Sequence, residues 1–207
     1  MTTKNEMTKK VVMDIVKQWK EKTKVRMMTP YIYFENLPTK KLIIQKLEEM
    51  KRNRYEKDVS KIKFPSDEAV TKTKRSSYHG VFENRFHISS HASLKEKSKV
   101  TGVPVSILNE VYKKGLGAYK SGHRPGANLY SWANARVNSF LTLGCAAFSS
   151  DSYLLKKVYD MKYSKKRHYF FTQKITCPKQ KRIQYQKKFS ASFLEKNNKY
   201  KKKDLNK

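Results

Sequence analysis

The short segment SGHRPG, residues 121–126, has the residue types best suited to chemistry in this chain. Its two glycines can adopt backbone conformations that other residues avoid, and its proline fixes its own φ and restricts the residue before it. The segment therefore predicts a rigid loop that presents His123 and Arg124. An arginine held in this way can bind a phosphate through two hydrogen bonds, and a neighbouring histidine can donate a hydrogen bond or transfer a proton.

A packed corner is the second interpretation of this loop, with Arg124 bonded to carbonyl groups at the end of a helix. Trp132 and Arg136 follow, four residues apart, and share one face of the next helix. They predict a cation–π pair or a base-stacking surface, or else a tryptophan that fills the core. The sequence leaves the choice open for His123 and Arg124, and it favours the core for Trp132.

Acidic residues that could complete a catalytic site with this loop are few. Glu110 and Asp151 are the candidates, and we expect them on separate elements. A metal-dependent nuclease needs clustered carboxylates or a set of His and Asp ligands. The sequence also has no glycine-rich phosphate loop, nucleophile elbow or HExxH motif. We therefore expect no catalytic residues, no metal and no cofactor, and an enzyme that uses the HRPG loop is kept as an alternative.

The charge of the chain is strongly and unevenly basic. It has 47 Lys and Arg residues against 17 Asp and Glu residues, a formal net charge of +30 in 207 residues. A polyanion relieves the self-repulsion of such a charge, and nucleic acid is the commonest one. Residues 121–155 carry 2 basic and 1 acidic side chains, whereas residues 156–207 carry 18 and 3. This predicts a nearly neutral core segment followed by a basic arm, whose interleaved lysines and aromatics suit phosphate contact and base stacking.

The expected nucleic-acid interface has a structured part at the loop and helices and a diffuse part in the basic arm. Its residues are His123, Arg124, Arg136, Lys113, Lys114, Lys156, Lys157, Lys165, Lys166, Arg167, Lys181, Arg182, Lys187 and Lys188.

Two cysteines and one short apolar run indicate whether the chain forms disulfides, binds zinc or crosses a membrane. Cys145 and Cys177 are too few for a disulfide framework, and without a CxxC pair they fit no common zinc pattern. We expect them to be reduced, in an intracellular setting. The apolar run at residues 140–148 is too short to cross a bilayer, and charges interrupt the apolar residues near the N-terminus. We therefore expect no membrane partner.

Apolar residues spaced three and four apart predict two helices in the first 60 residues. One covers about residues 7–19, and the other follows Thr39 as its N-cap. The stretch from Asp58 to His91 is polar and lacks a period, which predicts a loop with short extended pieces. We divide this part into N-terminal basic helices at 1–60 and a polar loop region at 61–92.

A helical core is predicted for residues 93–160. SLKEKSKVTG predicts a helix closed by Gly102 in the left-handed conformation, and Pro104 suits the first turn of the next helix. The pair resembles a helix-turn-helix, although Lys97 and Thr101 occupy two of its normally apolar positions.

The second helix of this pair is expected to end at a glycine, residue 115 or 117. Further helices are expected from Tyr130 and from Ser150 or Asp151, and the basic arm takes up residues 161–207. The overall prediction is an all-α protein, a small helical bundle with a helix-turn-helix-like hairpin and a basic C-terminal arm.

Residues 101–140, TGVPVSILNEVYKKGLGAYKSGHRPGANLYSWANARVNSF, resemble an uncharacterised domain family of large DNA viruses and tailed phages. The family pattern has a TG pair between two helices, then KGxGAxxSGxRPG, then SWxxARxxSF, and a helix that starts with D-x-x-L. These motifs match residues 101–102, 114–126, 131–140 and 151–154, and the resemblance extends over about residues 31–157. It implies a viral origin and no particular reaction.

We therefore expect a viral protein that binds nucleic acid mainly through phosphates, as a virion-associated or genome-packaging protein. DNA is expected in preference to RNA, and other virion proteins are a second class of partner. The expected location is the virion, otherwise the cytoplasm or nucleus of a host cell, or the bacterial cytoplasm for a phage. The alternatives are a minor capsid or scaffold protein, a nucleic-acid-processing enzyme and a ribosome-like RNA-binding component.

Overall fold

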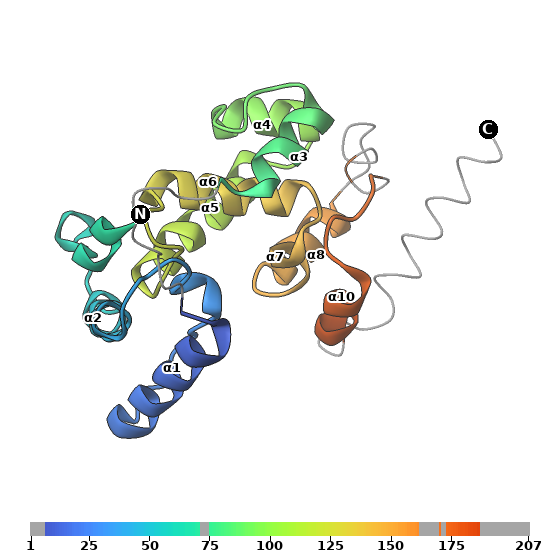
Figure 1. The fold of residues 1–207 in the computed structure, drawn as a ribbon. Helices are drawn as coiled ribbons and strands as arrows, with labels where there is room; N and C mark the ends of the chain where they lie inside the picture. The colour runs from blue at the N-terminus through green and yellow to red at the C-terminus, as the bar shows by residue number, and fades with distance from the viewer. Residues whose placement is uncertain (1–6, 71–74, 162–169, 171–172, 187–207) are drawn as a thin grey trace, which may run out of the picture. The chain divides into compact units, whose positions relative to one another are not determined.

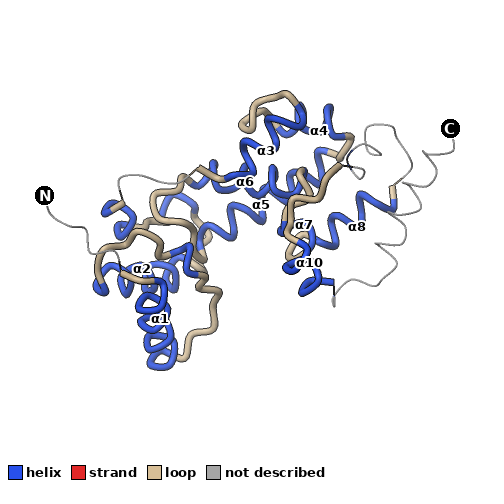
Figure 2. The backbone as a smooth tube through the Cα atoms, turned by 45° about the vertical axis from the view of Figure 1, so that its right-hand side comes forward, coloured by secondary structure: helices blue, strands red, loops and turns tan. Residues whose placement is uncertain are grey.

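Helices and the loops between them make up the described chain. The structure, a computed structural model, describes residues 7–70, 75–161, 170 and 173–186 (Figure 1). Figure 2 shows helices and loops and no strand in these ranges, so the predicted all-α fold is confirmed. The chain divides into two compact units, which we call the first unit (residues 1–74 and 116–132) and the second unit (residues 75–115 and 133–207).

The first unit is built around two amphipathic helices that pack against each other. Each begins at a threonine whose hydroxyl accepts a backbone N–H, as a helix N-cap does. The apolar faces of both helices enter one core. Both helices predicted for this part of the chain are therefore confirmed. The elements are α1 (Lys9–Thr23), η1 (Tyr31–Tyr33), α2 (Lys40–Asn53), η2 (Val59–Lys61) and η3 (Pro65–Ala69), where η marks a 3-10 helix.

The second unit contains the predicted helical hairpin. Its elements are α3 (Ser77–Phe86), α4 (Leu94–Thr101), α7 (Cys145–Phe148), α8 (Ser152–Asp160) and α10 (Lys179–Gln186), and α5 (Val105–Lys120) and α6 (Leu129–Leu141) carry residues of both units. Helix α4 ends at Gly102 with a φ of 71°, as predicted. Lys97 and Thr101 are fully buried at the normally apolar positions. The Lys97 ammonium donates to the Ser90 carbonyl at 2.8 Å, and the Thr101 hydroxyl donates to the Lys97 carbonyl at 2.7 Å.

Helix α3 corrects the prediction that residues 58–91 form a polar loop with short extended pieces. Its buried face has few apolar residues, chiefly Phe82 and Phe86, whose ring centroids lie 5.0 Å apart. So few apolar positions produce no recognisable helical period. Two residues four apart are nevertheless enough to fix one face of a helix in the core.

Helix α5 continues to Lys120 and does not end at either glycine. A Cβ atom at Gly115 would lie only 2.7 Å from the Cα atom of Ala133 in α6. Gly115 therefore allows α5 and α6 to pack closely, and it does not end α5.

A disulfide joins Cys145 to Cys177, so the expectation that no disulfide forms was wrong. The backbone N–H groups of Thr176 and Cys177 donate to the Leu143 carbonyl at 3.2 and 3.1 Å, which places residue 177 beside residue 145. The Gln173 amide also donates to the Leu141 carbonyl at 2.7 Å. This long-range pairing leaves no trace in the cysteine spacing. Residues 173–177 of the predicted arm are thus attached to the second unit, and most of the arm lies outside the described residues.

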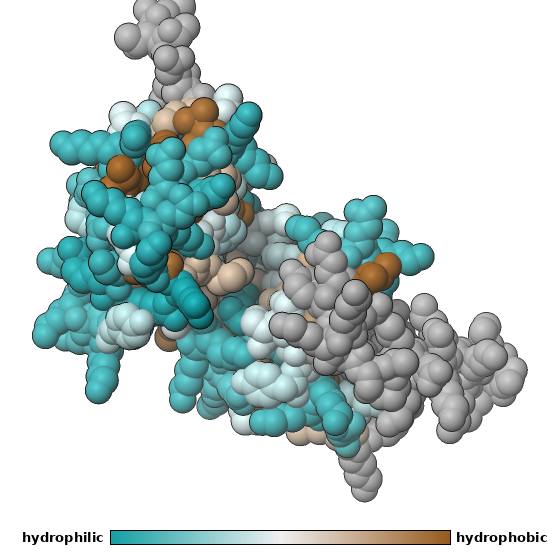
Figure 3. All heavy atoms as spheres, turned by 90° about the horizontal axis from the view of Figure 1, so that it is seen from below, coloured by the Kyte–Doolittle hydropathy of each residue, from teal (hydrophilic) through white to brown (hydrophobic). Residues whose placement is uncertain are grey.

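Hydrophilic side chains cover most of the face drawn in Figure 3, and hydrophobic ones appear there as small separate areas. Among the helices of the described residues, none is both long enough and apolar enough to cross a bilayer.

Candidate functional site

The HRPG loop has the backbone that its glycines predict. Gly122 has a φ of 131° and Gly126 a φ of 73°. A Cβ atom at Gly122 would lie 2.5 Å from a ring carbon of Tyr33 and 2.6 Å from the Met50 methyl group. The loop, residues 121–126, therefore packs tightly against the core of the first unit at Gly122.

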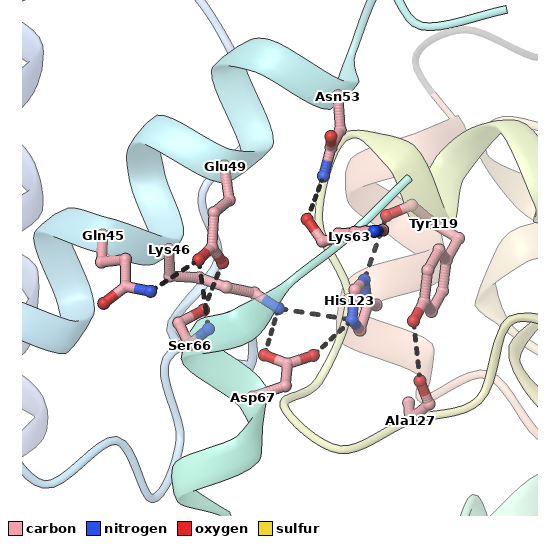
Figure 4. A network of polar contacts seen from close by, with 10 residues as sticks. All are labelled: Gln45, Lys46, Glu49, Asn53, Lys63, Ser66, Asp67, Tyr119, His123 and Ala127. Atoms are coloured by element: carbon pink, nitrogen blue, oxygen red, sulfur yellow. Dashed lines mark hydrogen bonds and ion pairs between the residues drawn. The ribbon is translucent and has the colours of Figure 1, made fainter. Parts of the chain in front are cut away.

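His123 is fully buried and lies in a cluster of polar and aromatic side chains (Figure 4). Its Nε2 atom lies 2.7 Å from Oδ2 of Asp67 in η3 and 3.3 Å from the Nζ atom of Lys46 in α2. Lys46 is also fully buried and forms an ion pair with Oδ1 of Asp67. On the other side of the ring, Nδ1 lies 3.0 Å from the Tyr119 carbonyl oxygen. We call Lys46, Asp67, Tyr119, His123 and Phe64 the His123 cluster.

Aromatic rings enclose the His123 imidazole. The Tyr119 ring stacks on it with 3.6 Å between centroids and an interplanar angle of 6°. The Phe64 ring meets it edge to face at 4.4 Å, and the Lys46 Nζ atom lies 4.1 Å from the Phe64 centroid. Rings on several sides keep water from the polar atoms, which strengthens the electrostatic contacts among them.

Hydrogen-bond geometry fixes one proton of this cluster, and burial and neighbouring charges shift the pKa values of its titratable groups. The Tyr119 carbonyl only accepts, so Nδ1 of His123 carries a hydrogen. The Nε2 atom faces both the Asp67 carboxylate and the Lys46 ammonium, and burial lowers the pKa of His123 against the opposing effect of the hydrogen bond with Asp67. Burial would raise the pKa of Asp67, but the hydrogen bond from His123 and the charge of Lys46 outweigh it and lower that pKa. Burial lowers the pKa of Lys46 against the opposing effect of Asp67.

These contacts correct the sequence-based assignment of His123 to the nucleic-acid interface. Both ring nitrogens and both Asp67 oxygens are engaged inside the fold, so the imidazole is not available to a phosphate in this conformation. Arg124 pairs with Glu35, with 3.2 Å between Nε and Oε2, and its side chain is 19% exposed. Trp132 lies edge to face with Tyr33 at 6.1 Å, but it is only half-buried and belongs to neither hydrophobic core, so its predicted place in the core is not confirmed.

A second polar cluster surrounds Asp151, which is fully buried in the second unit. The Arg136 guanidinium donates to both of its carboxylate oxygens, at 2.9 and 2.7 Å. The Lys114 Nζ atom lies 3.1 Å from Oδ1 of the same carboxylate, and it also donates to the Ser150 carbonyl. One buried carboxylate thus holds two basic side chains that are 17% and 30% exposed.

Tyr153 extends this cluster toward solvent. Its hydroxyl donates to the Glu110 carboxylate, and this hydrogen bond, more than burial, raises the pKa of Tyr153 to about 12. The Nζ atoms of Lys114 and Lys157 lie 4.5 and 5.5 Å from the centroid of its ring. We call Glu110, Lys114, Arg136, Asp151, Tyr153 and Lys157 the Asp151 cluster.

Of the predicted interface residues, the structure therefore brings Lys114, Arg136 and Lys157 together around Asp151 and Tyr153. Lys113, Lys156 and Lys181 are exposed. The Arg182 guanidinium lies 6.0 Å from the centroid of the Phe148 ring. The remaining predicted residues lie outside the described residues, and they are Lys165, Lys166, Arg167, Lys187 and Lys188.

Sequence reasoning missed Lys46, Asp67 and Tyr153. A signal existed for Lys46, which lies on the apolar face of α2 between Ile43 and Met50. Tyr153 lies beside the apolar stripe of α8, which marks it as an exposed aromatic side chain. Asp67 lies in a polar stretch with no comparable signal.

The acidic candidates Glu110 and Asp151 are paired with cations of the second unit, whereas His123 and Arg124 bond to residues of the first unit. Within the described ranges, no three His, Cys, Asp or Glu side chains gather as metal ligands would. The fold and its two clusters define an all-α basic protein with charged side chains buried in both of its units.

A family model matches residues 30–153, which is more than half of the chain. The protein belongs to this family, which is described as a family of unknown function (DUF5824). The comparisons with curated proteins and with solved structures found no match.

Proposed function

We propose that this protein binds nucleic acid mainly through the phosphates, DNA in preference to RNA. The observation that carries the proposal is the Asp151 cluster, in which one buried carboxylate fixes Lys114 and Arg136 side by side. Basic side chains fixed in position lose little conformational entropy when they bind a phosphate. Lys113 and Lys156 flank the cluster in sequence and are exposed.

The overall charge supports the same proposal. Asp and Glu side chains are too few to neutralise 47 Lys and Arg residues, and the surplus of 30 positive charges favours a polyanionic partner. The resemblance of residues 101–140 to a family of large DNA viruses and phages leads us to propose a virion-associated or genome-packaging role. In such a role, contacts to the phosphates suffice because no particular base sequence has to be read.

A salt titration tests the proposed function. The full-length protein is titrated into a fluorescently labelled DNA duplex at several salt concentrations, and the logarithm of the binding constant is plotted against that of the salt concentration. Each neutralised phosphate contributes a slope of about −0.9 on duplex DNA, so we expect a steep line. The same titration is made with a single-stranded DNA of equal length, and a flat line or no binding at low salt with both DNAs would refute the proposal.

A pair of triple variants tests whether the second unit is the main contact. We expect Lys113→Gln/Lys156→Gln/Lys157→Gln to weaken binding and to reduce the slope by about 1–3. The matched control, Lys10→Gln/Lys22→Gln/Lys41→Gln, removes the same charge from exposed positions of the first unit. Equal effects of the two variants would show that charge alone matters, and would remove the special role of the Asp151 cluster.

A further inference from the structure

Tyr153 is an exposed aromatic side chain held in a fixed orientation. It is 43% exposed, whereas Leu154, Leu155 and Val158 of the same helix are buried. Its hydroxyl donates to Glu110, which fixes the far end of the side chain. An aromatic ring exposed and restrained in this way can stack on another flat ring with little loss of entropy.

Positive charge surrounds the ring. Lys114 and Lys157 approach it at 4.5 and 5.5 Å from the centroid, and Lys114 is itself anchored to the buried Asp151 carboxylate that also binds Arg136. Two carboxylates, from Glu110 and Asp151, lie in the same cluster and already accept hydrogen bonds or ion pairs. Three basic groups against two acidic ones leave the cluster positive.

We infer that Tyr153 is a stacking platform for an unpaired base, with Lys114, Lys157 and Arg136 contacting the phosphates on either side of that base. This inference rests on the proposed function and specifies its ligand as single-stranded nucleic acid. A duplex hides the faces of its bases inside the stack, whereas a single strand can lay one base on an exposed aromatic ring while cations follow its backbone. A cationic patch without an exposed ring would contact only phosphates, which both the duplex and the single strand carry, so it would not favour the single strand.

The test compares two labelled DNA ligands, a 20-nucleotide oligothymidine and a duplex of 20 base pairs, at equal salt with the full-length protein. Loss of one base–aromatic stack weakens binding about 5- to 150-fold. We expect Tyr153→Ala to weaken binding of the single strand by that factor and to change binding of the duplex less than about threefold. Tyr153→Phe retains the ring and is expected to bind the single strand about as well as the unaltered protein.

Tyr55→Ala is the matched control, since Tyr55 is 78% exposed and the Arg54 guanidinium lies 5.4 Å from the centroid of its ring. We expect this variant in the first unit to bind both ligands like the unaltered protein. Circular dichroism is used to check that each variant folds. Comparison with Tyr153→Phe separates the effect of losing the ring from the effect of losing the hydrogen bond to Glu110.

The inference is overturned if Tyr153→Ala binds the single strand normally, if it weakens both ligands equally, or if Tyr55→Ala has the same effect. It is also overturned if polyglutamate binds as tightly as the single strand and responds equally to Tyr153→Ala, because the face would then suit an acidic protein. An unaltered protein that binds neither DNA would refute the proposed function as well. Binding with a steep salt dependence but no response to Tyr153→Ala refutes the stacking platform alone.

Discussion

The Nε2 atom of His123 lies 2.7 Å from Oδ2 of Asp67, a residue 56 positions earlier in the chain. The other oxygen of Asp67 pairs with Lys46 of α2. One carboxylate therefore connects α2, η3 and the HRPG loop within the first unit. Because Lys46 and His123 are fully buried, Asp67 supplies the negative charge that allows these two side chains to stay in the interior.

Asp67→Asn tests this connection. The substitution leaves the buried Lys46 without its ion-pair partner, and removing one member of a buried pair costs about 3–5 kcal/mol. We expect the free energy of unfolding, measured by urea denaturation at pH 7, to fall by that amount. Acid should have a related effect: the pKa of Asp67 is lowered in the folded protein, so its stabilisation is present above the unfolded-state pKa and is lost as the pH falls through the folded-state value.

Glu68→Gln is the matched control, because Glu68 is the next residue of η3 and is exposed. We expect this variant to unfold within about 0.5 kcal/mol of the unaltered protein. The double variant Lys46→Met/Asp67→Asn should recover part of the loss, since no unpaired charge is then buried. Equal stability of Asp67→Asn and Glu68→Gln would contradict the role assigned to Asp67.

Local signals made part of the fold predictable. The hairpin of α4 and α5 follows from the Ser93 cap, which forms a capping box with Glu96, and from Gly102 at the helix end. The left-handed glycines of the HRPG loop also followed from residue type. Each of these features depends on interactions between residues that are close in sequence, so the sequence contains the information directly.

The candidate sites were harder to predict because they depend on distant residues. His123 stands out in the sequence, but its partner Lys46 lies 77 positions away, and only the folded chain shows that the imidazole is buried. The apolar surroundings of Asp151 indicated a core segment, yet they did not indicate that its carboxylate would bind both Arg136 and Lys114. The burial of a polar group is decided by tertiary packing, on which local sequence has little influence.

Gly115→Ala and Gly117→Ala should change stability in opposite directions, although both lie in α5. A Cβ atom at Gly115 would lie 2.7 Å from the Ala133 backbone, and overpacking of this kind costs about 1–3 kcal/mol. A Cβ atom at Gly117 would meet nothing within 4 Å, so alanine there should add about 0.5–1 kcal/mol by its higher helix propensity. Urea denaturation of both variants measures the difference, and a stabilising Gly115→Ala would contradict the close approach of α5 and α6.

Protonation of His79 should make the protein less stable in mild acid. Burial, helped by the positive charges of His91, Arg75 and Lys97, lowers the pKa of His79 from 6.5 to about 4. Between these values the unfolded chain binds a proton that the folded chain does not bind, so the free energy of unfolding falls as the pH falls from 6.5 to 4. The loss is at most about 3.5 kcal/mol, because one pKa unit corresponds to about 1.4 kcal/mol.

Urea denaturation at a series of pH values measures this effect in the unaltered protein and in His79→Gln. Glutamine does not titrate, so the variant should lose much of the slope between pH 6.5 and 4. His87→Asn is the control, because His87 is exposed at the end of α3 in a left-handed conformation that asparagine tolerates. If the slope persists in His79→Gln and disappears in His87→Asn, the pH dependence does not come from His79, and the prediction is wrong.

The disulfide between Cys145 and Cys177 should stabilise the second unit by restricting the unfolded chain. It closes a loop with a sequence separation of 32, and loops of this size are stabilised by about 3–4 kcal/mol in the chain-entropy account. Cys145→Ala, Cys177→Ala and the double variant should therefore lose similar stability, because either single change already removes the bridge. Denaturation of all three with and without a reducing dithiol measures the loss, and the dithiol should weaken only the unaltered protein. The prediction is contradicted if the denatured, unreduced protein has two thiols that react with a thiol reagent, because the bridge is then absent. In that case, hydrogen bonds to Leu141 and Leu143 would hold residues 173–177 to the turn between α6 and α7.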